Sequence, residues 1–460
     1  MRRHHSNSGH MRRYPAATAG VLALLAATAC SDFLEVRPTT QVPAEEAIVD
    51  ARSANAAAAG MYDELQSTNY YGGDFTIFMD LSGPDVIHSG TFTSYADADD
   101  NNLTADNGAV QGIWAAAYAA IGRANTLLER LPGVASLTTA DRNRLTGEAY
   151  FIRALAYHDL VRIFGEQSPS GLGVPLRLTP PKTIDETFVV RRATVAQVYT
   201  QINADLDAAE PLLAGLSNRQ RATQTAVRAL RARVRLYQRD WAGALAAARA
   251  VVTTPGRALA TRFQDLFTPD AADTPENIFQ LAFSAADASN LGYFYIMKPL
   301  GGRREIAPSV SFSNSFEAGD LRRDVTTKPL TSAATRFYGA KYPSTAGNDD
   351  IHIIRLAEVI LIKAEAHAEL GQLDSATVEV NKIRTRAGLA PVATFPDLAT
   401  ALAEIMKQRR YELALEGHRW PDLVRTGAAA AAFGTQALYP IPQREIDVTA
   451  KGALIQNPGY

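Results

Sequence analysis

The sequence predicts a mainly α-helical protein in which paired helices form a scaffold and one loop-rich, irregular segment is inserted. Alanine is abundant, apolar residues recur every three or four positions in several segments, and the stretch 253–350 lacks that period. The chain has 460 residues, of which 47% are hydrophobic and 20% charged, so it can bury a large core. Its formal net charge of −2 provides no basic surface, and we do not expect nucleic acid as a partner.

Helical periodicity identifies the scaffold. In 110–130, apolar residues from Trp114 to Leu128 recur at helical spacing and form one face. Similar patterns divide the scaffold into two parts, about 45–252 and 351–427, on either side of the irregular segment, where we expect short strands. The expected helices cover 110–130, 147–164, 194–214, 222–238, 240–252, 355–370, 373–386 and 397–416.

Two of the expected helix pairs are internally similar. Shifting the segment 229–252 along the chain places Ala232 on Ala364 and Ala244 on Ala376. Small residues at matching positions allow antiparallel helices to approach closely, and these pairs resemble the tetratricopeptide helix-turn-helix unit. Because the loop-rich segment separates the two copies, we do not expect a continuous solenoid.

The amino terminus has the pattern of a bacterial lipoprotein signal. A basic run, Met11–Tyr14, precedes the uncharged stretch Ala16–Ala29, which ends in small residues directly before Cys30. Cys30 is the only cysteine, so no intramolecular disulfide or cysteine-based metal site can form, and its place favours lipidation. We expect residues 1–29 to be removed, with 1–10 a start-site extension. An ordinary secretory signal followed by a chance cysteine is the alternative.

The densest charged cluster lies in 408–425. Arg409, Glu412 and Glu416 fall on one face of the expected helix, where ion pairs at three- and four-residue spacing can form. Glu412 and Glu416 could instead be the acid and base of a glycoside hydrolase, which needs two carboxyl groups facing one bond. With arginines at hand, ion-paired structural roles are the stronger interpretation. Gly417 suits a position just after a helix end.

This cluster resembles the carboxy-terminal signature of the SusD/RagB family of outer-membrane nutrient-uptake lipoproteins. Gln408 replaces the usual glutamate, and Pro421 stands where an aromatic residue is common. The matching residues are Arg409, Glu412, Leu413, Glu416, Gly417, Arg419, Trp420, Asp422, Leu423 and Arg425. Further resemblances follow the family's order along the chain, at 30–35, 153–157, 164–165, 355–359, 364–366, 381–384, 441–442 and 456–460.

The resemblance implies about four tetratricopeptide-like helix pairs in a SusD-like domain of residues 30–460, with a ligand-binding subdomain at about 253–350. It also implies a protein with no enzymatic activity and no cofactor, anchored by lipid to the outer membrane and facing the cell exterior. There it would capture oligosaccharide and deliver it to a SusC-like TonB-dependent transporter. Peptide binding, as in RagB-like members, is the alternative. A tetratricopeptide scaffold that binds only proteins and a membrane-attached hydrolase are further alternatives.

Carbohydrate binding requires flat aromatic faces beside hydrogen-bonding side chains. Two loop-rich zones, 69–95 and 293–338, offer both, and the resemblance places the family's ligand contacts in these zones without fixing their positions. For each ring, packing within the loops is the alternative. The candidate ligand-binding residues are Tyr95, Tyr293, Tyr295, Arg303, Arg304, Phe337 and Tyr338.

Acidic residues gather between Asp97 and Asp106. Asp97 and Asp99 are a candidate for calcium, but an EF-hand loop fails because its sixth position is Asn102 instead of glycine. Asp106 is expected instead to cap the helix that follows. We therefore expect no metal site. The common hydrolase, metalloprotease and nucleotide-binding motifs are also absent from the sequence.

Overall fold

Helices make up most of the described chain, as the sequence predicts. The predicted signal segment and Cys30 lie outside the described residues, and Ile48–Tyr460 forms one unit. The computed structural model describes residues 47–180, 191–268, 274–449 and 452–460.

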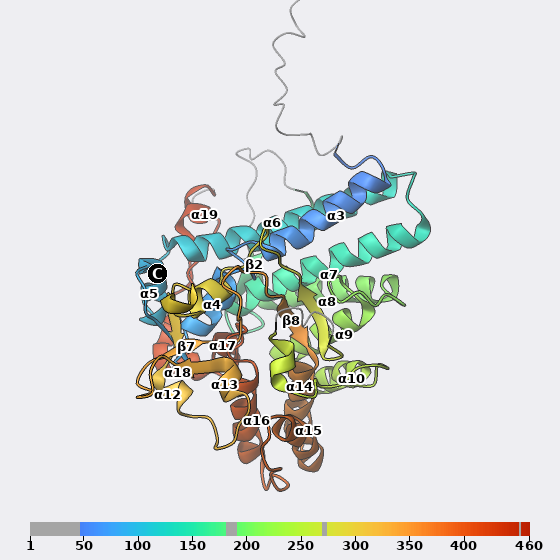
Figure 1. The fold of residues 1–460 in the computed structure, drawn as a ribbon. Helices are drawn as coiled ribbons and strands as arrows, with labels where there is room; N and C mark the ends of the chain where they lie inside the picture. The colour runs from blue at the N-terminus through green and yellow to red at the C-terminus, as the bar shows by residue number, and fades with distance from the viewer. Residues whose placement is uncertain (1–46, 181–190, 269–273, 450–451) are drawn as a thin grey trace, which may run out of the picture. The chain divides into compact units, whose positions relative to one another are not determined.

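The long helices form the scaffold (Figure 1). Most of them begin and end close to the predicted positions, although α7 begins earlier and α16 ends earlier than the periodicity indicates. Their bounds are α3 Ala51–Gln66, α6 Gly108–Arg130, α7 Thr139–Phe164, α8 Val195–Leu212, α9 Gln224–Tyr237, α10 Trp241–Val252, α14 Leu356–Glu369, α15 Leu373–Arg386 and α16 Leu398–Glu412.

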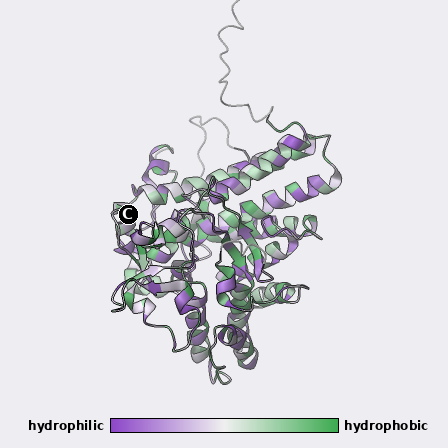
Figure 2. Ribbon diagram, viewed as in Figure 1, coloured by the Kyte–Doolittle hydropathy of each residue, from purple (hydrophilic) through white to green (hydrophobic). Residues whose placement is uncertain are grey.

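These helices pack in pairs, α3 with α6, α7 with α8, α9 with α10, and α14 with α15. The pairing agrees with the predicted fold class of about four helix pairs. Hydrophobic and hydrophilic residues alternate around the long helices, as expected of amphipathic segments that cover a shared core (Figure 2). Of the three tryptophans, Trp114 and Trp420 are buried in that core, and Trp241 is partly buried against it.

Short polar residues begin most of these helices. Thr138, Thr194 and Asp240, for example, each accept a hydrogen bond from a backbone N–H in the first turn that follows. The cap of α6 differs from the prediction. Asn107, not Asp106, holds its first turn, because the Asn107 side chain accepts from the N–H groups of the next turn and donates to the carbonyl of Ser94.

The two similar helix pairs are neighbours in space, although the irregular segment separates them in the sequence. Helix α10 of the first pair packs against α14 of the second. The matched residues Ala232, Ala364, Ala244 and Ala376 are all fully buried. These small side chains therefore lie between closely packed helices, as the sequence comparison predicts.

The irregular segment contributes short strands and short helices rather than a sheet domain. The short helices of the described chain include α4 Asp74–Leu81, α5 Thr93–Asp99, α11 Leu291–Tyr295, α12 Val310–Ser313, α13 Arg323–Thr326, α17 Arg419–Arg425, α18 Ala428–Phe433 and α19 Gln443–Asp447. The strands are β1 Val86–His88, β2 Leu172–Pro175, β3 Arg192–Thr194, β4 Asn277–Leu281, β5 Ile306–Pro308, β6 Thr327–Pro329, β7 Phe337–Gly339 and β8 Ile351–Arg355.

The strands form antiparallel pairs that join distant parts of the sequence. β1 pairs with β5, β2 with β3, β4 with β8, and β6 with β7. Strand β4 is buried along its length, and its Phe279 contacts the rings of Tyr62 and Phe151 in the scaffold helices. The irregular segment therefore shares the scaffold's core, and it adds a small hydrophobic cluster of its own around Phe263 and Phe267. None of the described helices is both long and apolar enough to cross a bilayer.

Candidate functional site

The two aromatic-rich zones of the sequence meet at the β1–β5 pair. Ile87 of β1 lies opposite Ala307 of β5, and the loops that leave these strands carry Phe92 on one side and Arg303 on the other. Helix α11, which holds Tyr293, contacts β5. Residues about 200 positions apart thus form one surface, which we call the Tyr293 surface and define by His88, Thr91, Phe92, Tyr293 and Arg303.

Arg303 is held in a fixed position on this surface. Its guanidinium lies 4.1 Å from the centre of the Phe92 ring, Nε donates to Glu305 over 2.5 Å, and Nη2 donates to the Thr91 hydroxyl over 2.8 Å. The Arg303 N–H also donates to the carbonyl of Tyr293. The Tyr293 ring is 40% exposed, the highest exposure among the predicted aromatic candidates. A planar cation and an exposed tyrosine are therefore carried by two backbone segments that are hydrogen-bonded to each other.

Glu305 fixes the loop opposite. Its buried Oε1 accepts from the backbone N–H groups of Thr91 and Phe92, each over 2.6 Å, and lies 3.1 Å from Nε2 of His88. Burial raises the pKa of the Glu305 carboxyl, but the hydrogen bonds from Phe92, Arg303 and Thr91 outweigh burial and leave it below its usual range. The carboxylate stays charged at neutral pH and keeps the loop closed on β5.

Tyr95 supports the surface from below. It is 3% exposed and packs edge-to-face on Phe92 and on Phe294. Its phenol donates to Asp74, whose pKa burial raises to about 6. Tyr95 therefore belongs to the packing beneath the Tyr293 surface, and its ring presents no face to solvent.

The other predicted ligand-binding residues are inside the protein. Tyr295 and Phe337 are fully buried, so protein covers the ring faces that a stacking role would require. Arg304 is also buried, and its guanidinium donates to the carbonyl of Phe337. Tyr338 is 9% exposed and lines a cleft of about 1130 Å³ with Phe316 and Lys328. Of the seven candidates, Tyr293 and Arg303 thus lie together on the surface.

Asp97 and Asp99, the calcium candidates, each bind a different neighbour. Asp97 accepts from the side chain of Asn107, and Asp99 accepts from the N–H of His88. No three acidic, histidine or cysteine side chains in the described part of the chain are grouped closely enough to hold a metal ion.

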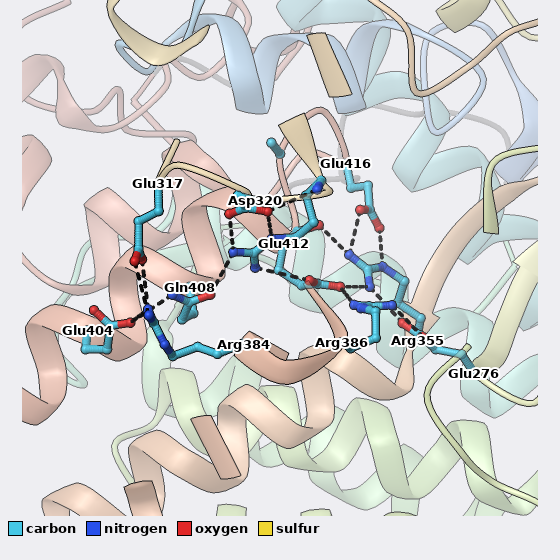
Figure 3. A network of polar contacts seen from close by, with 12 residues as sticks. Glu276, Glu317, Asp320, Arg355, Arg384, Arg386, Glu404, Gln408, Glu412 and Glu416 are labelled. Carbon is cyan, nitrogen blue, oxygen red and sulfur yellow. Dashed lines mark hydrogen bonds and ion pairs between the residues drawn. The ribbon is translucent and has the colours of Figure 1, made fainter. Parts of the chain in front are cut away.

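Two signature glutamates, Glu412 and Glu416, belong to a buried charge network (Figure 3). Arg355 donates to Glu412 over 2.5 Å, to Glu416 over 2.8 Å and to Glu276 over 2.9 Å. Lys341 adds a second cation to Glu416 at 2.7 Å. The signature thus joins α16 to β8 and to the end of the irregular segment. We call Arg355, Glu276, Glu412, Glu416 and Lys341 the Arg355 network.

The predicted ion pairs along one face of the 397–416 helix are wrong in their partners. Helix α16 ends at Glu412, and Glu416 lies in the turn that follows, so Glu416 does not share the helix face of Arg409 and Glu412. Arg409 binds Asp422, which also binds Arg425, while Arg419 lies 3.1 Å from Asp85. Glu412, Glu416 and Arg409 are ion-paired as expected, but with partners from other elements.

The local structure explains the residue types at two further positions of the signature. Gly417 takes a φ of +75° in the turn, and its N–H donates to Asp80. Gln408 is buried between Arg322, from which it accepts, and Glu404, to which it donates. A glutamate at position 408 would have no proton to donate to Glu404, so the amide fits this chain.

Sequence reasoning missed Phe92, Glu305 and His88. Phe92 lies three positions before Tyr95 in the zone already considered, so its aromatic character could have included it. No pattern in the sequence points to Glu305, because its role depends on the pairing of β1 with β5, which joins segments about 200 residues apart.

Comparisons with known proteins match this architecture. A family model described as starch-binding and associating with the outer membrane matches residues 32–236, and a model of the SusD family matches 326–437. A SusD-like protein, P2, of Formosa agariphila is 27% identical, with 96% of this chain and 98% of that protein aligned.

Solved structures agree with the sequence matches. A SusD superfamily protein from Bacteroides thetaiotaomicron superposes with a TM-score of 0.78 at 25% identity, over 89% of this chain and all of that one. A laminarin-binding SusD-like protein superposes with a TM-score of 0.77 at 25% identity, over 90% of this chain and all of that one.

Fold and signature together define a helical-scaffold protein of the carbohydrate-binding class. The two family models together match more than half of the chain, and the P2 protein aligns with 96% of it. The chain belongs to the SusD family.

Proposed function

We propose that this protein binds glycans at the cell surface without cleaving them and passes them to a SusC-like TonB-dependent transporter. Membership of the SusD family supports both the outer-membrane location and the transporter partner. The laminarin-binding relative supports an oligosaccharide as the ligand. A lipid on Cys30, the only cysteine in the chain, would anchor the protein with its binding surface toward the exterior.

One observation carries the glycan proposal: the backbone of the exposed Tyr293 is hydrogen-bonded to that of Arg303, whose guanidinium is already fixed in place. A sugar ring presents C–H faces that pack on an aromatic ring and hydroxyl groups that accept from a guanidinium. Because Phe92, Thr91 and Glu305 hold Arg303, little side-chain freedom is lost when a ligand binds.

The carboxylates of the signature do not support hydrolysis. A glycosidase acid needs a raised pKa, and its partner carboxylate must face the same bond. Burial alone would raise the pKa of Glu416, but Arg355 and Lys341 lower it to about 2. The pKa of Glu412 is lowered further by Arg386, Arg355 and Arg322, against the effect of burial. Both groups are fully buried and ion-paired.

The test is calorimetric titration of laminarin and malto-oligosaccharides into the parent protein and Tyr293→Ala. We expect the parent to bind at least one of these glycans, and Tyr293→Ala to lose about 1–3 kcal/mol of binding free energy, as for a central contact anchor. Phe433→Ala is the matched control, because Phe433 is a 37% exposed aromatic residue on another element, α18, and should bind like the parent.

Equal affinity of Tyr293→Ala and the parent would place the glycan elsewhere on the molecule. A parent that binds no glycan but binds a mixture of short peptides would instead support the peptide alternative. The melting temperature of each variant is recorded alongside, so that a loss of binding can be separated from a loss of folded protein.

A further inference from the structure

A wide cleft in the irregular segment shares no lining residue with the Tyr293 surface. Its volume is about 1130 Å³, just above the roughly 300–1,000 Å³ typical of ligand sites, so it has room for more than one sugar residue. The lining comes from three stretches of the irregular segment, 262–268, 314–329 and 338–343.

Strand geometry shows which side chains of the β6–β7 pair point into the cleft. In β7, Phe337 and Gly339 lie on one side, and a Cβ on Gly339 would meet the buried ring of Tyr295, so that side faces the core. Tyr338 therefore points the opposite way, and it is the residue of β7 that lines the cleft. Lys328 lies directly opposite Tyr338 in the pair, so it projects from the same face and also lines the cleft.

Aromatic side chains make up much of the apolar lining. Tyr338 is nine-tenths buried, so it presents an edge to the cleft and not a stacking face. Phe263 and Phe267 are buried as well, whereas Phe316 keeps more of its surface accessible. An accessible ring beside hydrogen-bonding side chains suits the C–H face and the hydroxyl groups of a sugar. The exposed neutral polar residues of the lining are Gln264, Thr268 and Asn314.

Two of the three acidic residues in the lining are paired with cations that lie outside it. Both carboxylate oxygens of Asp320 accept from Arg322. The carboxylate of Glu317 lies 2.8 Å from Arg384 and 2.8 Å from Lys407. These two acids therefore do not neutralise the cations of the cleft itself.

Two cations of the lining have no acidic partner among the described residues. Lys328 is exposed and forms no ion pair there. Arg323 donates from Nε to a backbone carbonyl over 3.3 Å, which leaves its Nη groups unused. The third cation, Arg262, is held by Asp265. Since Asp324 is the one acid of the lining without a cation partner in the described chain, the unpaired charge of the cleft is positive.

We propose that this cleft binds oligosaccharides that carry acidic groups, with Lys328 and Arg323 as the cations that receive carboxylates or sulfates and Phe316 as the ring that packs on a sugar. Hydrogen bonds between charged groups are stronger than those to neutral hydroxyls. The inference rests on the proposed function only in taking a sugar as the class of ligand. It concerns a different place and a differently charged ligand, so each can fail without the other.

The direct test measures how fast the lysines of the parent protein are acetylated, by peptide mass spectrometry, with and without a probe. The carboxylate probe is trigalacturonate, the sulfate probe is a κ-carrageenan tetrasaccharide, and maltotriose is the neutral control. We expect at least one acidic probe to slow the acetylation of Lys328 saturably, and maltotriose to leave it unchanged. Lys298, an exposed lysine between Tyr293 and Arg303, reports on the Tyr293 surface in the same experiment.

The outcomes separate the two proposals. Unchanged acetylation of Lys328 with both acidic probes would overturn the inference, and so would equal protection by maltotriose. Protection by triglutamate as strong as that by the acidic sugars would also overturn it, because the cleft would then recognise charge alone. Protection of Lys298 without Lys328 supports the Tyr293 surface and rejects the cleft, and the reverse result supports the cleft without the Tyr293 surface.

Calorimetry on charge variants tests the sign of the effect. Lys328→Gln should weaken binding of the acidic probe about tenfold, as for one charged hydrogen bond, whereas Asp324→Asn should strengthen it about twofold by removing a like charge. Both side chains are exposed, so neither change should alter the melting temperature. Lys382→Gln is the matched control, because Lys382 is an exposed lysine on α15 outside the lining, and it should bind like the parent. Equal affinity of Lys328→Gln and the parent would contradict the proposal.

Discussion

At the scale of single residues, Glu416 shows why burial and partners decide what a charged side chain does. Its carboxylate is almost completely removed from water, yet Arg355 and Lys341 keep it ionised. Leaving one of these cations unpaired in the interior is costly, because no ion pair then offsets the free energy spent on removing its hydration water. A residue that looks catalytic by type is structural by position.

Glu416→Gln should therefore act on stability. The amide keeps the shape but not the charge, so we expect the free energy of unfolding to fall by about 3–5 kcal/mol at pH 7, as for a broken buried ion pair. Chemical denaturation measures this directly. Glu129→Gln is the control, because Glu129 is 46% exposed and should change stability by less than about 0.5 kcal/mol. A Glu416→Gln variant as stable as the parent would contradict the structural role.

The same substitution should change the pH dependence of stability. The folded-state pKa of Glu416 is lowered from 4.5 to about 2, so the carboxylate stabilises the fold above about pH 4.5. That contribution is lost as the pH falls toward 2. Glu416→Gln should therefore lose less stability than the parent between pH 4.5 and 2.

At the Tyr293 surface, the sequence does not predict which aromatic side chains are exposed. Tyr293 and Tyr295 are two positions apart in similar surroundings, but Tyr293 is 40% exposed and Tyr295 is fully buried. Their difference comes from the packing of α11 against other parts of the chain, because the Tyr295 ring lies against Tyr342 and Gly339. No local pattern separates the two rings.

At the scale of elements, the sequence places the helices, whereas it predicts short strands in the irregular segment without giving their positions or partners. The periodicity of α9, α10 and α15 is local, since one face of each helix packs on the core. The strands β1 and β5 are three residues each and pair across more than two hundred positions, so no local pattern of the sequence places them. The site lies on these short elements, which is why the sequence indicated its zones but not its residues.

Gly292 in α11 provides a test of how closely that element is held. A Cβ at this position would overlap the carbonyl oxygen of Ser344, so Gly292→Ala should displace α11 and, with it, Tyr293. We expect a loss of about 1–3 kcal/mol in stability from overpacking and weaker glycan binding. Gly108→Ala is the control, because nothing lies within 4 Å of a Cβ there. Normal stability and binding in Gly292→Ala, by thermal melting and calorimetry, would show that α11 tolerates displacement.

At the scale of the whole molecule, the proposed anchor, Cys30, lies outside the unit Ile48–Tyr460 in the sequence. Cys30→Ser removes the thiol that a lipid would occupy and leaves Ile48–Tyr460 unaltered. If the lipid is the anchor, the variant should leave the membrane fraction and be recovered in the soluble fraction, with unchanged glycan affinity. Fractionation followed by immunoblotting measures this. A variant that stays with the membrane would require another means of attachment.

The packing of α10 on α14 has a consequence for how such a molecule can change. Because α10 ends at Val252 and its neighbour α14 begins at Leu356, the chain between them leaves the scaffold and returns to the same place, as a closed detour. The entropic cost of closing a detour grows only with the logarithm of its length, about 0.6 kcal/mol for each doubling. Insertions and deletions in the exposed loops of this stretch, away from buried β4 and the Arg355 network, therefore cost the scaffold little, and new ligand preferences can arise there while the paired helices stay as they are.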